Sequence, residues 1–285
     1  MDPTTALIIA GAVGGAAGKL IEQAWGTGKK WLETYFRDHH PTAQKSAQQN
    51  ALDFLASLAN RVHDLEEALA DTPDAKRQIE CALSDPDFAA MLKDALIASA
   101  RTESSEKHKL LARVVSERLT AQPESMVSLA GNLACSAIPH LSSKHLRCLG
   151  VMAVVFHIRP TPFPPPTIPI ELLPSWWTEW LSTVLSPVVP TANPSKIDYE
   201  HLVSVSCASL IYLGTRDLKK VLFPPELASF KWDANQFLTE TEVGKRLSEL
   251  WKGGMNRTYP TSAGQLIGTY VVDLLVGMNT TIDWD

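Results

Sequence analysis

Two residues with nucleophilic chemistry stand three positions apart near the middle of the chain, His145 and Cys148. Residues at this spacing lie on one face of an α-helix, and a cysteine beside a histidine is the minimum of a thiol nucleophile. Cys148, however, sits in the apolar run RCLGVMAVV, where a buried thiol stays neutral and inert. We therefore interpret the pair as part of a helical core rather than as a catalytic pair.

Other patterns that could carry a reaction are incomplete. His201 and Cys207 are six residues apart and would not share a helical face. The sequence HDLEE lacks the second histidine of a helical metal site, and no glycine-rich loop ends in Lys-Ser or Lys-Thr to hold a phosphate. The sequence therefore predicts a protein that is not an enzyme, with no catalytic residues, no metal site and no cofactor. A group of acidic residues favours a solvated helix end: Asp64, Glu66, Glu67, Asp71 and Asp74.

Composition and charge limit the class of protein. With 285 residues, of which 45% are hydrophobic, the chain can bury one large core or two smaller ones. The formal net charge of -5 comes from interleaved acidic and basic residues, which give no basic field along a phosphate backbone, so nucleic acid is not an expected partner. The cysteines lack the close pairs of zinc sites and favour reduced core thiols in a cytosolic protein: Cys81, Cys135, Cys148 and Cys207.

The opening of the chain is unusual because glycines recur where a helix is expected. Gly11, Gly14, Gly15 and Gly18 fall in a run of alanine and valine, and each weakens a helix by about 1 kcal/mol relative to alanine. Their small-xxx-small spacing lets two helix backbones approach closely. Three interpretations stay open: a helix packed in its own domain, a helix–helix contact between copies, or insertion into a membrane.

Aromatic and basic residues follow the glycines and resemble a membrane-interface anchor. They are Trp25, Lys29, Lys30, Trp31 and Tyr35. The N-terminus does not resemble a signal peptide, because it carries Asp2 and no cation before Lys19. The uncharged run over residues 3–18 is also shorter than the roughly 20 residues of a spanning helix. We expect a cytoplasmic protein, with membrane association on activation as an open alternative.

Periodic apolar residues predict a mainly α protein. A first helix, with Asp2 and Pro3 at its start, is expected to run to residue 36 or to break at residues 26–28. Further helices are predicted over residues 51–69, 71–83, 84–100, 106–119, 125–138 and 142–156. No stretch of this half alternates as a strand would.

The composition changes abruptly at residues 159–196, which are rich in proline and carry Trp176, Trp177 and Trp180 on a short predicted helix. We interpret these tryptophans as packing a connector onto the helical core. The predicted domains are an N-terminal glycine-rich amphipathic helix (1–40), a helical domain (41–158), the Pro/Trp-rich connector (159–196) and a winged-helix-like subdomain (197–285).

The last ninety residues suggest the winged-helix order of three helices, a wing and a helix. The first helix is expected over residues 199–214 with Asp198 as its cap, the second over 215–223, and the third over 239–251 with Thr239 and Glu242 at capping-box spacing. A wing over 253–260 would lead through Thr-x-x-Gly at 261–264 into a last helix that is expected from about Ser262. Cations on the third helix are offset by glutamates, which favours protein–protein packing over DNA reading.

Four segments together resemble a bacterial family. They are SARTESSEKHKLLARVVSERL, LSSKHLRCLGVMA, DYEHLVSVSCASLIYLGTRDLKKVL and TSAGQLIG. In this order they are similar to the uncharacterised LPO/Vpar-type family, and more distantly to the Abi-alpha abortive-infection family, over Leu52 to Gly277. The resemblance implies a cytoplasmic bacterial protein with a role in phage defence, and it carries over no catalytic residue.

Two functions therefore stay open. The first is a non-enzymatic, abortive-infection-like anti-phage effector, which forms a homo-oligomer through its N-terminal helix and acts at a membrane surface when triggered. The second is a soluble protein–protein interaction module or scaffold that binds another bacterial or phage protein. They differ in what the first helix does.

Overall fold

The computed structural model of the chain describes residues 16–68, 77, 81–82, 84–223, 232–282 and 284. These residues are mainly helical, as the sequence predicts, and the two strands among them are three residues long. The chain divides into two compact units, residues 1–139 and 140–285. Each unit buries apolar side chains of its own.

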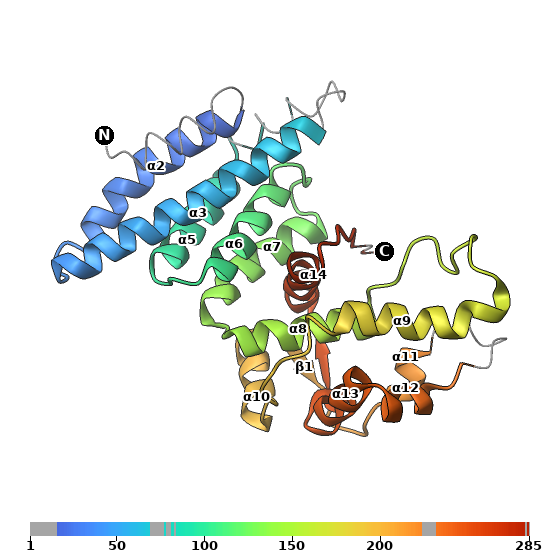
Figure 1. The fold of residues 1–285 in the computed structure, drawn as a ribbon. Coiled ribbons are helices and arrows are strands. Elements are labelled where there is room, and N and C mark those ends of the chain that lie inside the picture. Colours follow the sequence, from blue (N-terminus) through green and yellow to red (C-terminus); the bar gives the residue numbers. More distant parts are fainter. Residues whose placement is uncertain are drawn as a thin grey trace. The chain divides into compact units, whose positions relative to one another are not determined.

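The first unit is built from long helices (Figure 1). They are α2 (Ala16–Tyr35), α3 (Pro41–Ala68), α5 (Pro86–Ala100), α6 (Ser105–Arg118) and α7 (Met126–Ala137). Helix α3 packs against α2, α5 and α6, and its Phe54, Leu55 and Leu58 are fully buried. Helix α3 therefore lies at the centre of this core.

Local hydrogen bonds explain where these helices start. Asp85 Oδ1 accepts the backbone N–H of Asp87, and Pro86 opens α5. The side chains of Ser104 and Ser125 accept backbone N–H groups at the starts of α6 and α7. Each cap satisfies a donor that the first helical turn leaves unpaired. The predicted starts of these three helices lie within two residues of the observed ones.

The second unit combines helices with a two-stranded sheet. It contains α8 (Ser143–Phe156), η2 (Ile170–Leu172), α9 (Leu173–Leu185), α10 (Lys196–Ser204), β1 (Ala208–Leu210), α11 (Leu218–Leu222), α12 (Ala234–Glu240), α13 (Glu242–Lys252), η4 (Met255–Arg257), β2 (Thr258–Pro260) and α14 (Ser262–Val276), and the short η1 (Ile138–His140) precedes α8. Helices α8 and α14 pack together although they are far apart in sequence. Glycine at position 268 allows them to approach closely, since a Cβ there would lie only 2.3 Å from the carbonyl oxygen of Leu149.

The two strands pair antiparallel, with Ser209 opposite Tyr259. Beyond the sheet, the backbone N–H of Thr261 donates to the Cys207 carbonyl at 3.1 Å, and Thr261 Oγ1 caps α14 by accepting the N–H of Gly264. A Cβ at Gly264 would lie 1.8 Å from the Cys207 oxygen, so this position excludes any side chain. The predicted start of the last helix at Ser262 is confirmed, and the Thr261 cap accounts for it.

The helix predicted from Asp198 is shorter than expected. Helix α10 begins at Lys196, with Ser195 as its cap, and Asp198 Oδ2 accepts the backbone N–H of Ser195 at 2.6 Å. The helix ends at Ser204 because Ser206 adopts a positive φ of 60° and the chain then enters β1. The helical prediction for residues 208–210 was therefore wrong.

The predicted capping box of the third helix was also misplaced. Thr239 lies inside α12, and Thr241 caps α13 by accepting the backbone N–H of Gly244 at 2.9 Å. The corner between the two helices is tight, since a Cβ at Gly244 would lie 2.1 Å from the Phe237 carbonyl oxygen. Of the two alternatives for the first helix, the structure has the one without a break, because α2 is continuous through residues 26–28.

The compact units divide the chain after Pro139, whereas the sequence predicts a domain boundary at the Pro/Trp-rich segment 159–196. The four predicted domains stay a prediction. Two contacts place α8 and the Pro/Trp-rich segment in the second unit. Helix α8 packs on α14, and it also packs on α9, which belongs to the Pro/Trp-rich segment and carries the fully buried Trp177. The Trp177 ring stacks on Trp180 at 4.9 Å and meets the edge of Trp232 at 6.5 Å.

The C-terminal elements run in the order α10, β1, α11, α12, α13, β2, α14. Strand β2 lies in the segment predicted as a wing, but its partner is β1 rather than a neighbouring strand within residues 253–260. The winged-helix assignment stays a prediction.

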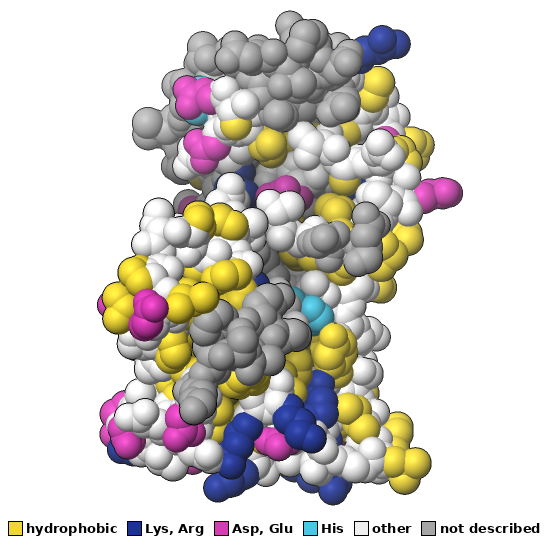
Figure 2. Space-filling view, turned by 90° about the vertical axis from the view of Figure 1, so that its right-hand side faces the viewer, with side chains coloured by type: hydrophobic (Ala, Val, Ile, Leu, Met, Phe, Trp, Pro, Cys, Tyr) yellow, Lys and Arg dark blue, Asp and Glu magenta, His cyan; other side chains and the backbone are white. Residues whose placement is uncertain are grey.

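Charges of both signs are scattered over the surface, as the sequence predicts. Figure 2 shows acidic and basic side chains on one face, with Lys and Arg side chains gathered near its lower edge. Buried or half-buried ion pairs also occur inside the units, such as Arg118 with Asp85 at 2.6 Å and Lys144 with Asp198 at 2.8 Å.

Candidate functional site

The glycines predicted to mediate helix association lie at the start of the chain. Gly11, Gly14 and Gly15 fall outside the described residues, so association through them stays a prediction. Gly18 lies near the start of α2 and is partly buried.

The described part of α2 packs within its own unit, against α3 and α5. Leu20, Ile21 and Leu32 are almost fully buried. At Gly28 the approach is closest, since a Cβ there would lie 1.9 Å from Leu96 Cδ2 of α5. Over residues 16–35 the helix is therefore an integral part of the first unit.

The C-terminal end of α2 exposes a row of rings. The rings of Trp31 and Tyr35 stack with their centroids 4.9 Å apart, and those of Tyr35 and His39 stack at 6.2 Å. Helical spacing puts Trp31 and Tyr35 on the same face as Ala24 and Gly28, both of which are buried. Tyr35 is nevertheless 50% exposed. We call Trp31, Tyr35 and His39 the aromatic row.

The predicted membrane-interface residues do not form a single group. Trp25 and Trp31 are partly buried, whereas Lys29, Lys30 and Tyr35 are exposed. Helical spacing turns both lysines away from the aromatic row. The structure thus brings Trp31 and Tyr35 together and leaves the lysines on other sides of α2.

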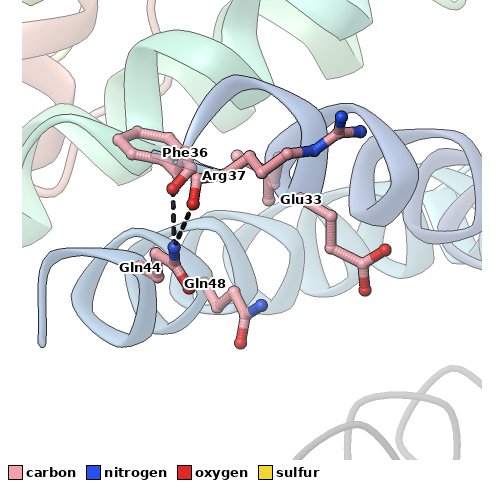
Figure 3. A pocket seen from close by; sticks show the side chains of 6 residues that line it. Glu33, Phe36, Arg37, Gln44 and Gln48 are labelled. Atoms are coloured by element: carbon pink, nitrogen blue, oxygen red, sulfur yellow. Dashed lines mark hydrogen bonds between the residues drawn. The ribbon is translucent and has the colours of Figure 1, made fainter. Parts of the chain in front are cut away.

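Gln44 of α3 fastens the corner between α2 and α3. Its Nε2 donates to the carbonyl oxygens of Phe36 at 2.7 Å and Arg37 at 3.1 Å, as Figure 3 shows, and also to that of His39 at 3.1 Å. These bonds satisfy carbonyls that the end of a helix leaves unpaired. A hollow of 180 Å³ lies beside them, lined by Leu32, Glu33, Phe36, Arg37, Gln44 and Gln48. Since ligand sites are typically about 300–1,000 Å³, we interpret this corner as a contact surface.

Across the ranges that the structure describes, no helix has both the length and the apolar character needed to cross a bilayer. In the same ranges, no three His, Cys, Asp or Glu side chains are grouped as metal ligands would be. Contact with a membrane surface stays a prediction.

In the second unit, a polar cluster joins the starts of α8 and α10. His145 Nε2 lies 3.1 Å from Asp198 Oδ1, and His145 Nδ1 accepts the backbone N–H of Ser142 at 3.2 Å. Because Nδ1 accepts, we infer that the proton is on Nε2, which donates to Asp198. Both ring nitrogens are thereby committed to bonds that hold the two helix starts.

The charges in this cluster follow from its burial. Burial lowers the pKa of His145, and the hydrogen bond to Asp198 opposes this only in part. Burial alone would raise the pKa of the Asp198 carboxyl, but hydrogen bonds from Lys144 and Ser195 lower it well below its usual range. At neutral pH the cluster therefore holds a neutral imidazole beside a lysine–carboxylate ion pair.

Three of the cysteines are buried, as the sequence predicts. Burial raises the pKa of the Cys135, Cys148 and Cys207 thiols to about 12, so they stay protonated and unreactive. Cys81 is exposed, which corrects the prediction of four core thiols. The difference arises within one helical stretch, where the neighbouring Ala82 takes the buried position.

A larger cavity of 520 Å³ lies beside the end of α8, with His157, Arg159, Gln265 and Thr269 in its wall. His157 Nε2 is buried and has no hydrogen-bond partner among the described residues. Burial lowers the pKa of this ring to about 4, and the Arg159 charge acts in the same direction. The Arg159 guanidinium donates to the Val154 carbonyl at 3.0 Å. The wall of the cavity therefore contains a neutral imidazole whose buried Nε2 has no hydrogen-bond partner among the described residues.

Comparison with known protein families finds a family model that matches residues 18–224, from α2 to just beyond α11, and this match is consistent with the Vpar-type family. The chain belongs to this family. Among curated proteins and among solved structures, none matches the chain. The family match includes three of the four segments that carried the resemblance, and the fourth, TSAGQLIG, lies beyond it. The Abi-alpha resemblance gains no support from this match.

Sequence reasoning missed one interaction centre within the family region. The Arg216 guanidinium lies 4.2 Å from the centroid of the Phe156 ring, 5.2 Å from that of Tyr259 and 5.6 Å from that of Trp251. The three rings lie far from Arg216 in the sequence, so no local pattern around Arg216 indicates this contact.

Proposed function

We propose that the chain is a non-enzymatic bacterial defence effector, which acts against phage by self-association through its N-terminal helix, at a membrane when triggered. The family resemblance suggests the defence role. The aromatic row at the end of α2 is the observation that supports self-association.

The aromatic row has the properties of a contact surface. Tyr35 continues the buried face of α2 but is half exposed, so the apolar face extends beyond the cover that the unit provides. Aromatic side chains are the usual anchors of protein contacts because each can bury a large area. Two copies that present the same row to each other would form an isologous dimer, in which each row covers the other.

Light scattering tests self-association directly. The double variant Tyr35→Ser/His39→Ser changes two exposed side chains of the row, and should lower the molar mass of the wild-type assembly to that of a monomer. Glu22→Ser/Glu33→Ser is the matched control, because both glutamates are exposed on other sides of α2. A wild type that is monomeric at every concentration, or an unchanged mass in the row variant, contradicts self-association through this surface.

Phage challenge tests the defence role separately. Bacteria that express the wild-type chain should show a lower plating efficiency of phage than bacteria with an empty vector. The row variant should lose this protection and the glutamate control should keep it. If the wild type gives no protection against any phage in a broad panel, the defence role is wrong even where self-association is observed.

The alternative function, a soluble interaction module for another bacterial or phage protein, is favoured by a different surface. Met126, Leu129 and Leu133 of α7 are about half exposed and lie at three- and four-residue steps, so they share one helical face. The two functions give opposite results in the phage assay. Loss of protection in Leu129→Ser/Leu133→Ser, with full protection in the row variant, favours the interaction module.

A further inference from the structure

The loop between β1 and α11 carries the two most exposed large apolar side chains among the described residues. Tyr212 is 88% exposed and Leu213 is 92% exposed. They are adjacent and are followed by Gly214, whose positive φ of 87° shapes the turn. No internal packing accounts for an exposed tyrosine–leucine pair.

This loop is held firmly at both ends. The backbone N–H of Ile211 donates to the Arg257 carbonyl at 2.7 Å, and the N–H of Arg216 donates to the Asn256 carbonyl at 3.0 Å. The Arg216 side chain lies among the three rings described above, and Trp251 Nε1 donates to its carbonyl at 2.9 Å. The tip therefore projects from a fixed base, and ordering it on binding costs little conformational entropy.

The base of the loop is basic, although the whole chain carries a net charge of -5. The two segments joined by these bonds, residues 211–223 and 252–259, contain five cations and a single acidic residue, Asp217. The cations are Arg216, Lys219, Lys220, Lys252 and Arg257. All but Arg216 are exposed. An apolar tip thus rises from a local positive field.

We propose that the Tyr212–Leu213 loop docks the chain on a bilayer that contains anionic phospholipid. A leucine at the tip gains most by entering the acyl boundary, tyrosine is suited to the headgroup layer, and lysines at the base attract anionic headgroups. A nucleic acid would pair its phosphates with the cations but would leave Leu213 without an apolar partner. This proposal concerns a different surface from α2 and does not depend on the defence role.

Vesicle sedimentation of the full chain tests the proposal. Wild type should sediment with vesicles of phosphatidylcholine mixed with phosphatidylglycerol, and at least tenfold more weakly with phosphatidylcholine alone. Raised salt should weaken binding, because it screens the attraction between exposed charges. Tyr212→Ser/Leu213→Ser and Lys219→Glu/Lys220→Glu should each reduce binding to mixed vesicles at least tenfold.

Ile197→Ser is the matched control, because Ile197 is 73% exposed on α10 of the same unit. It should bind vesicles as wild type does, and circular dichroism should show that all variants are folded. A Leu213→Trp variant should show a blue shift of its emission on binding mixed vesicles, relative to wild type. Absence of that shift, or vesicle binding that is unchanged in the double serine variant, overturns the proposal.

Two further outcomes separate this site from other surfaces. If vesicle binding is lost in Tyr35→Ser/His39→Ser and kept in the loop variants, the membrane contact belongs to α2 and the proposal is wrong. If wild type ignores vesicles but the double serine variant lowers its mass in light scattering, the loop contacts protein, which also overturns the proposal.

Discussion

Gly28 of α2 lies so close to Leu96 of α5 that a Cβ at residue 28 would stand 1.9 Å from Leu96 Cδ2. Gly26, two residues earlier on the same helix, has no heavy atom within 4 Å of the corresponding position. Two glycines of one helix thus have opposite roles: one makes room for a neighbour, and the other is merely tolerated.

Substitutions at these two glycines should therefore change stability in opposite directions. Gly28→Leu should lower the free energy of unfolding by about 1–3 kcal/mol, because it overpacks a buried contact. Gly26→Ala should raise it by about 0.5–1 kcal/mol, because alanine restricts the unfolded chain and favours the helix. Urea unfolding of both variants gives the measurement. Equal effects of the two substitutions would show that α2 does not pack on α5 in solution.

The four thiols should differ sharply in reactivity. In the native protein a thiol reagent should modify Cys81 alone, since the other three are buried and their pKa is raised to about 12. In denaturant all four should react. The native reaction should vanish in Cys81→Ser, and rapid native labelling of Cys135, Cys148 or Cys207 would contradict the packing of the cores.

His157 should make the stability of the second unit sensitive to pH. Its pKa is about 4 in the folded protein and 6.5 when unfolded, so the unfolded state binds more protons between these values. The free energy of unfolding should be highest above pH 6.5 and fall steadily as the pH drops to about 4. The lowered pKa of His145 adds a loss of the same sign.

The variant His157→Gln isolates this effect. Urea unfolding across the same pH range should show a flatter dependence than wild type, with the contribution of His145 retained. An equally steep dependence in the variant would mean that the buried ring is not the group that titrates.

The tryptophans of α9 should contribute unequally. Trp177 is fully buried among Trp180, Trp232 and Phe163, whereas Trp176 is partly exposed. Trp177→Ala should cost about 3–5 kcal/mol, typical of a truncated buried aromatic residue. Trp176→Ala should cost clearly less. Thermal melting checks this, and similar losses in both variants would argue against the specific packing of α9.

Local chemistry made part of the fold predictable from the sequence. The starts of α5, α6 and α7 were found because each depends on a cap within three residues of the start. The same holds for Thr261 and Gly264 at the start of α14. These signals are complete within one turn of helix.

Features that depend on distant partners were not predictable. The segment 208–210 looks helical by its apolar spacing, and it becomes a strand because residues 258–260 pair with it. Nothing near His145 indicates Asp198, and nothing near Gly28 indicates Leu96. The candidate surfaces were found in part: the sequence singled out Trp31 and Tyr35 by type, but not His39 or the Tyr212–Leu213 loop.

The packing of α8 on α14 has a consequence for synthesis of the chain on the ribosome. Helix α8 ends at Phe156 and its partner begins at Ser262, so translation must continue for roughly 5–20 s before the two can meet. Helices α5, α6 and α7 are consecutive neighbours and can assemble as they emerge. During that interval the nascent chain carries one assembled unit and an uncovered apolar helix, which is the kind of segment that chaperones bind.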